Sequence, residues 1–153
     1  MNLTEHFSIE EMTRTTHAEF QEINRLLAAS FMVNMKQVCG QLELIRDYFA
    51  RPIFITSGFR CPGLNDAIGG SATSQHMRGE AADFVVKDFQ DETGLGIVFD
   101  WCGHHLNYGQ LIFERPTNRK PWIHIGLPHR PIPANHLESG DGRHYGAKRG
   151  FMG

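Results

Sequence analysis

Hydrophobic residues recur at helical spacing through the first third of the chain. Residues 31–49 carry a stripe that predicts one long helix with a buried face, formed by Phe31, Met35, Val38, Leu42, Ile45 and Phe49. Residues 18–29 repeat this spacing at Phe20, Ile23, Leu26 and Leu27. A partner-binding face is the alternative for both stripes, but packing into the core is favoured. Ser8 and Glu11 form a capping-box pattern, which predicts a short helix at 9–14.

Beyond Pro52 the apolar period changes to two, which is typical of strands. Four strands are predicted, at 53–56, 81–87, 110–114 and 122–127. A loop or short helix is expected at 62–68, and a helix capped by Asp91 is expected to run to about His105. Helices that precede a sheet with one intervening helix predict an α+β fold. We expect N-terminal helices packed on a small, mainly antiparallel sheet.

The 153 residues suffice for a single domain with a core of its own. We assign residues 1–127 to the folded domain and residues 128–153 to an irregular C-terminal tail of the same domain, because the tail is rich in Gly, Pro and polar residues. The tail is expected either to pack on the domain or to move independently. Its histidines are expected to be solvated rather than metal ligands: His129, His136 and His144.

The charge balance narrows the classes of partner. With 15 basic and 17 acidic residues the formal charge is −2, which disfavours nucleic acid and anionic membrane surfaces as partners. The sequence lacks an apolar run long enough for membrane insertion and begins without the pattern of a signal peptide, so synthesis in the cytoplasm is expected. Cys39, Cys61 and Cys102 are expected to be reduced, buried thiols rather than a disulfide framework.

Three residues stand out as a candidate zinc site. His76 and Asp83 lie in SQHMRGEAAD (74–83), and His124 lies in PWIHIGL (121–127). Two imidazoles and one carboxylate leave a fourth position of zinc open for water, as in catalytic sites. Strand alternation places Asp83 and His124 away from their bulkiest apolar neighbours, and Gly79 permits a turn that returns His76 toward Asp83. On spacing alone, ordinary hydrogen-bonded side chains remain the alternative to a metal site.

The motifs around these residues resemble those of one zinc peptidase superfamily. S-x-H-x-x-G-x-A-x-D at 74–83 and W-x-H at 122–124 match its pattern, as do the segments TSGFRCPGLNDAIGG (56–70) and GQLIFE (109–114). Its members include zinc D-Ala-D-Ala carboxypeptidases, vancomycin-resistance D,D-dipeptidases and phage L-alanyl-D-glutamate endolysins, and the Hedgehog signalling domain shares the fold. LTEHFSIEEMTR at the start resembles phage-encoded members. The resemblance covers about residues 3–127.

The resemblance implies roles for individual residues. It makes His76, Asp83 and His124 the zinc ligands and gives Arg60 the task of stabilising the oxyanion. Ser74 and Trp122 are implied to contact the substrate.

The general base is the point where this chain departs from the family pattern. Several members carry Glu or Asp three residues before the last histidine ligand, and Pro121 stands there in this chain. Glu114 is the best substitute, because pairing of residues 114 and 122 in a hairpin would place Glu114 on the face of His124. The alternatives for Glu114 are an orienting contact to His124 or an ion pair with Arg115 or Arg119.

Other charged residues near these motifs have simpler explanations. His104 and His105 fall at the expected end of a helix, where they cap it as cations. Arg78 and Glu80 are expected to be exposed loop charges.

The leading functional hypothesis is a zinc metallopeptidase that hydrolyses bonds involving D-amino acids in peptidoglycan stem peptides or cross-links. A phage or prophage product would reach the wall through a holin-type pore or as part of a virion, with other virion proteins as further partners. The alternatives are a cytoplasmic D-Ala-D-Ala dipeptidase and a structural virion module that keeps the zinc fold without catalysis.

Overall fold

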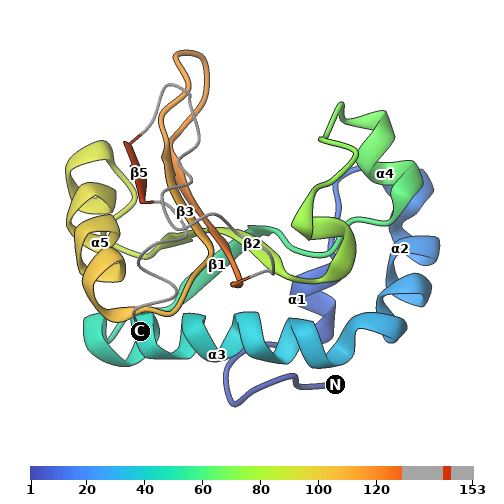
Figure 1. Cartoon of the computed structure of the whole chain (residues 1–153), viewed down its shortest axis with the longest axis horizontal. Helices are drawn as coiled ribbons and strands as arrows, with labels where there is room; N and C mark the ends of the chain where they lie inside the picture. Colours follow the sequence, from blue (N-terminus) through green and yellow to red (C-terminus); the bar gives the residue numbers. More distant parts are fainter. Residues whose placement is uncertain (129–142, 146–153) are drawn as a thin grey trace.

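A five-stranded antiparallel sheet forms the centre of the molecule, in the order β1-β2-β4-β3-β5 (Figure 1). The computed structural model describes residues 1–128 and the backbone of residues 143–145. The strands are β1 (Ile53–Ser57), β2 (Ala81–Val86), β3 (Gln110–Glu114), β4 (Trp122–Gly126) and β5 (Arg143–Tyr145). The predicted α+β class and the four predicted strands are therefore confirmed.

Five α-helices and three short 3-10 helices accompany the sheet in the described part of the chain. The α-helices are α1 (Ile9–Thr13), α2 (Gln21–Ala28), α3 (Met32–Phe49), α4 (Pro62–Ala67) and α5 (Glu92–His105). The 3-10 helices are η1 (Ala18–Phe20), η2 (Ala29–Phe31) and η3 (Gln75–Arg78). The predicted caps are both present: Ser8 and Glu11 form the capping box of α1, and the Asp91 side chain accepts from the Gly94 backbone N–H. None of these helices is long and apolar enough to cross a membrane.

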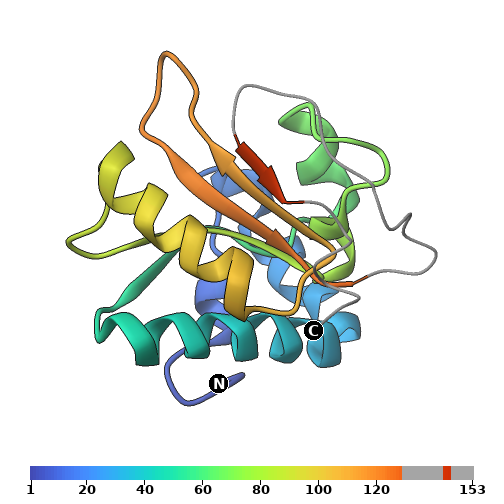
Figure 2. The same cartoon turned by 60° about the vertical axis from the view of Figure 1, so that its left-hand side comes forward.

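The hydrophobic core lies between the sheet and the helices α3 and α5, which lie along one side of it (Figure 2). The strands contribute Ala82, Phe84, Val86, Ile123 and Ile125, each almost fully buried. The predicted stripe of α3 supplies Met35, Val38, Leu42 and Ile45. Because β2 and β4 use every second residue for this core, their remaining side chains are directed to the opposite face of the sheet.

The predicted core stripe of residues 18–29 is confirmed only at Phe20, which packs partly buried against the core, and is wrong for its other three residues. Ile23 and Leu27 are each 40% exposed and Leu26 is 67% exposed. The helix α2 instead buries Asn24, whose side chain donates to the carbonyls of Thr13 and Phe59 and accepts from the backbone N–H of Cys61. These three bonds satisfy the buried amide, so α2 is held through its polar face rather than its apolar one.

Part of the C-terminal tail departs from the prediction of irregular structure. Residues 143–145 form β5, in which the backbone of His144 pairs with Ile112 of β3. The predictions for His129 and His136 lie outside the described residues.

Local charges and thiols mostly follow their predictions. His104 and His105 end α5 and hydrogen-bond the carbonyls of Asp100 and Trp101. The three cysteines are free and buried, as predicted. Arg78 and Glu80 are not simple exposed charges: Arg78 Nε lies 2.7 Å from Glu80 Oε1, and the Glu80 side chain is only 14% exposed. This ion pair links the last residue of η3 to the residue that precedes β2.

Candidate metal centre

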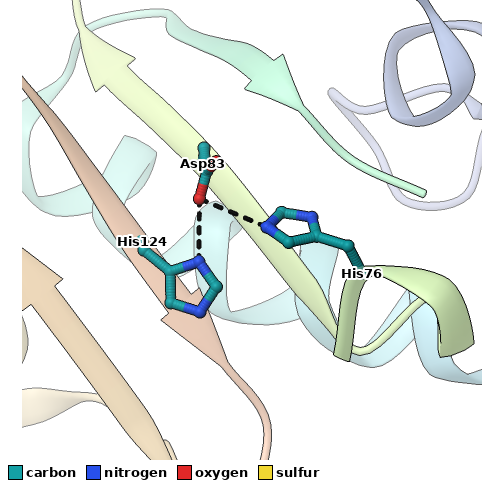
Figure 3. Close-up of side chains that lie close together, drawn as sticks. All are labelled: His76, Asp83 and His124. Carbon is teal, nitrogen blue, oxygen red and sulfur yellow. Dashed lines mark hydrogen bonds and ion pairs between the residues drawn. The ribbon is translucent and has the colours of Figure 1, made fainter. Parts of the chain in front are cut away.

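The pairing of β2 with β4 brings two of the three candidate ligands together. Asp83 and His124 are direct partners across this antiparallel pair, so their side chains leave the same face of the sheet. His124 Nδ1 lies 2.8 Å from Asp83 Oδ1. Figure 3 shows both side chains directed toward one point, with His76 approaching from the side.

His76 reaches this point from η3 rather than from the sheet. Gly79 ends η3 with φ +67°, a conformation that L side chains rarely adopt, and so lets the chain turn into β2 as predicted. The His76 ring is buried, its Nδ1 donates to the carbonyl of Gly58 at 2.7 Å, and its Nε2 lies 3.4 Å from Asp83 Oδ1. Because the Gly58 carbonyl can only accept, His76 Nδ1 carries a proton, and Nε2 is the ring nitrogen that faces Asp83.

The three side chains fit a transition-metal ion. Each offers one ligand atom, and these atoms lie within 4.8 Å of one another. Two ligand atoms on tetrahedral zinc are roughly 3.3–3.4 Å apart, because the bonds are about 2.0–2.1 Å long. The 3.4 Å between Asp83 Oδ1 and His76 Nε2 matches this value, whereas the 2.8 Å between Asp83 Oδ1 and His124 Nδ1 is the length of a hydrogen bond. Two imidazoles and one carboxylate are also the donor set expected for a catalytic zinc ion.

Electrostatics at Asp83 favour a charged ligand. Burial alone would raise the pKa of the Asp83 carboxyl, but attraction to His76 and hydrogen bonds from His124 and His76 outweigh it, so the pKa lies well below its ordinary value. The carboxylate is therefore ionised at neutral pH. His124 Nε2 is buried and has no hydrogen-bond partner among the described residues, so this ring still has a polar atom to satisfy.

Arg60 and Ser74 lie beside the three candidate ligands. The Arg60 backbone N–H donates to the His76 carbonyl at 3.1 Å, and Nη2 of its guanidinium lies 3.4 Å from Ser74 Oγ. Ser74 also caps η3 by accepting from the His76 backbone N–H. Burial lowers the pKa of Arg60 and attraction to Asp83 opposes this shift. The Arg60 guanidinium therefore faces the same cluster as the carboxylate.

A cleft of about 1030 Å³ opens above these residues. One side is formed by the β3–β4 hairpin and the other by α4 with the loop that follows it; in Figure 1 the hairpin rises on the left and α4 stands on the right. His76, Asp83 and His124 line it together with Arg60 and Ser74. The sequence-predicted residues are thus brought together in one cavity.

The register of the hairpin is the predicted one. Glu114 pairs with Trp122 and Ile112 pairs with His124, so Glu114 lies on the face of His124, one diagonal step away. Both Glu114 and Trp122 line the cleft. Arg115 of the turn pairs with Glu92 at 3.0 Å, and Arg119 lies over the Trp122 ring.

Several residues that shape the cleft were not found from the sequence. The Gly58 carbonyl orients His76, and a Cβ on Gly58 would come 2.8 Å from Cα of Met12. Gln75 bonds the Leu127 carbonyl and packs against Gly126, where a Cβ would displace the end of the Gln75 side chain. Gly58 after β1 and Gly126 at the end of β4 were the signals in the sequence that could have pointed to these contacts. Arg14, His17 and Arg119 also line the cleft and carry no motif.

Comparison with known proteins identifies one family. The family model described as Peptidase M15 matches residues 5–125. No curated protein matches the chain. The matched segment contains both motifs with the three candidate ligands, as well as Arg60 and Glu114.

Proposed function

The chain belongs to the peptidase M15 family, whose members are zinc-dependent metallopeptidases, and we propose that it hydrolyses peptide bonds involving D-amino acids in bacterial peptidoglycan. The convergence of His76, Asp83 and His124 on one point at the floor of a large cleft carries this proposal. Zinc bound there would supply Lewis acidity toward the scissile carbonyl and toward water.

The residues around the ligands provide the remaining parts of a hydrolytic site. Arg60 is suited to hydrogen-bond the oxygen of the scissile carbonyl as negative charge develops on that oxygen. Its guanidinium lies beside Ser74 and is attracted electrostatically to Asp83. Besides the candidate ligand Asp83, Glu114 is the carboxylate that lines the cleft on the His124 face. We assign Glu114 the role of general base, which accepts the proton of the attacking water. Ser74 and Trp122 are proposed to contact the substrate peptide.

The cleft favours a peptide longer than a dipeptide. Its volume of about 1030 Å³ reaches the upper end of the range for small-molecule pockets, roughly 300–1,000 Å³. A stem peptide or cross-link therefore suits it better than free D-Ala-D-Ala. The likeness of residues 3–14 to phage-encoded members supports a phage or prophage product that reaches the wall through a holin-type pore or within a virion.

Pro121 favours a second candidate function. It occupies the position three residues before His124 where several relatives carry a carboxylate, and it has no proton acceptor in its side chain. A module that keeps the metal-binding fold without catalysis, for example in virion assembly, would tolerate this residue.

Incubation of the purified protein with peptidoglycan distinguishes these functions. The proposed peptidase releases peptides whose masses identify the cleaved bond, and a chelator abolishes the release until zinc is restored. Free D-Ala-D-Ala serves as a parallel substrate, and its preferential hydrolysis would favour the dipeptidase. Intact peptidoglycan after incubation with zinc-loaded protein would contradict the peptidase and leave the non-catalytic module.

A further inference from the structure

Among the charged side chains that line the cleft, arginines outnumber carboxylates. Three arginines line it, Arg14, Arg60 and Arg119, whereas the lining carboxylates are Asp83 and Glu114. Asp83 is shared between two histidines at the candidate metal site. The whole chain carries a formal charge of −2, so this excess of arginine is local to the cleft. A positively charged cleft attracts anionic ligands.

Arg119 is the arginine of the hairpin turn, and it is held in a specific way. Its guanidinium carbon lies 4.8 Å from the centroid of the Trp122 ring. Stacking on an aromatic face holds a guanidinium in place without occupying its N–H donors, which lie in the plane of the group. Within residues 1–128 no carboxylate forms an ion pair with Arg119. Its donors thus remain available to a ligand.

Arg115, in the same turn, is arranged differently. Its guanidinium lies over the Phe113 ring, and its Nη1 is 3.0 Å from Oε1 of Glu92 at the start of α5. Arg115 lines a separate cavity with residues of α5. One arginine of the turn therefore fastens the hairpin to α5, and the other faces the cleft.

We propose that Arg119, stacked on Trp122, binds a carboxylate of the substrate and so selects anionic peptides. This inference rests on the proposed peptidase function and names the substrate class of the same cleft. A planar guanidinium can hold a carboxylate by two parallel hydrogen bonds. Contact with the indole ring restricts the guanidinium, which reduces the entropy lost on binding.

The strand geometry indicates where that carboxylate lies. Trp122 precedes the candidate ligand His124 by two residues on β4, a step of about 6.6 Å along the strand. An extended peptide advances about 3.3–3.6 Å per residue. For a peptide that lies extended along β4, the recognised carboxylate would belong to a residue about two positions from the scissile bond, on the Glu114 side of the cleft.

The test uses a synthetic stem peptide and a set of analogues in which one carboxylate at a time is replaced by a carboxamide. Wild type, Arg119→Gln and the matched control Arg115→Gln are compared on every peptide. When the peptide is cleaved, kcat/KM is measured; when it is not, calorimetry of the same peptides with the protein as purified gives Kd. This second readout separates failure of the inference from failure of the proposed function.

We expect one amidated analogue to lose about 10-fold in kcat/KM or affinity with wild type, in the range of a charged hydrogen bond. Arg119→Gln should lower the parent peptide to the level of that analogue and leave the analogue itself unchanged, whereas Arg115→Gln should retain the discrimination. Loss of less than about 2-fold for every analogue, or equal loss on all peptides with Arg119→Gln, would overturn the inference. Discrimination that persists in Arg119→Gln would do so as well.

Discussion

Asp83 and His124 face each other directly across neighbouring antiparallel strands, with 2.8 Å between Oδ1 and Nδ1. The pairing of the backbones determines this distance, because direct partners in an antiparallel pair have Cβ atoms about 4.5–5.5 Å apart. Only His76 must be supplied from outside the sheet. The paired strands therefore hold two of the three candidate ligands in place, and the position of the third, His76, depends on the short helix η3.

Replacement of Asp83 by Asn should remove the charge that a metal cation needs while keeping the size of the side chain. We expect wild type to be purified with one zinc ion per chain and Asp83→Asn to lose at least about 100-fold in zinc affinity, the upper end of the loss for a contact that merely supports a ligand. Elemental analysis and competition with a chromogenic chelator measure both quantities. Asp91→Asn is the matched control, because Asn also caps a helix and Asp91 lies at the start of α5. Wild type without stoichiometric metal would refute the site.

Arg60→Ala should separate metal binding from turnover. If the guanidinium stabilises the oxyanion, kcat should fall by about 10²–10³-fold while zinc content stays at one per chain. Arg51→Ala is the control, because that exposed arginine pairs with Asp88. Peptide hydrolysis and elemental analysis on the same samples give the two values. Loss of zinc from Arg60→Ala would instead assign Arg60 a structural role.

The elements of the fold were predictable because apolar period and capping chemistry agree along most of the chain. The α3 stripe, the Asp91 cap and the alternation around Asp83 each act locally, so the sequence reveals them. The orientation of α2 was not predictable. It depends on Asn24 bonding to backbone groups of Thr13, Phe59 and Cys61, and such a long-range polar contact leaves no periodic signal.

The candidate site divides in the same way. Strand parity was enough to place Asp83, His124 and Glu114 on one face, and the observed register agrees. The contact between His76 of η3 and the carbonyl of Gly58 after β1 joins residues 18 positions apart, and no local pattern encodes it. The same holds for the stacking of Arg119 on Trp122, which depends on the path of the hairpin turn.

The N-terminal segment should contribute stability that depends on pH. Glu43 of α3 accepts hydrogen bonds from Thr4 Oγ1 and from the backbone N–H of His6, and lies 2.7 Å from His6 Nδ1. Burial raises the pKa of Glu43, but these bonds lower it by a larger amount. The pKa of Glu43 therefore lies below the ordinary value of 4.5. A carboxyl with a lowered pKa in the folded state stabilises the protein above its unfolded-state pKa, and this contribution is lost as pH falls toward the folded-state pKa.

Glu43→Gln should therefore lower the free energy of unfolding at pH 7 by about 1.5–3 kcal/mol, the range for hydrogen bonds to a charged group. The difference from wild type should shrink as the pH falls below about 4.5. Urea unfolding at a series of pH values measures it. Glu22→Gln, on the exposed face of α2, should show no such trend. A difference that stays constant with pH would show that the Glu43 charge does not contribute.

Glu114 provides the most discriminating test of the catalytic proposal. Glu114→Gln keeps the size and much of the hydrogen bonding of the side chain but cannot accept a proton from water. If Glu114 is the general base, turnover should fall by at least about 10²-fold with zinc still bound. If Glu114 instead orients His124, zinc affinity should fall by about 10–100-fold, and excess zinc should restore activity.

The control for this variant is Glu92→Gln, because Glu92 at the start of α5 pairs with Arg115 of the hairpin turn, outside the cleft. Its turnover and zinc affinity should stay near those of wild type. Zinc titration followed by kcat measurement at saturating zinc separates the two roles in a single series. Near-native turnover and affinity in Glu114→Gln would exclude both roles. Because Pro121 cannot act as a base, the module without catalysis would then become the better account of this chain.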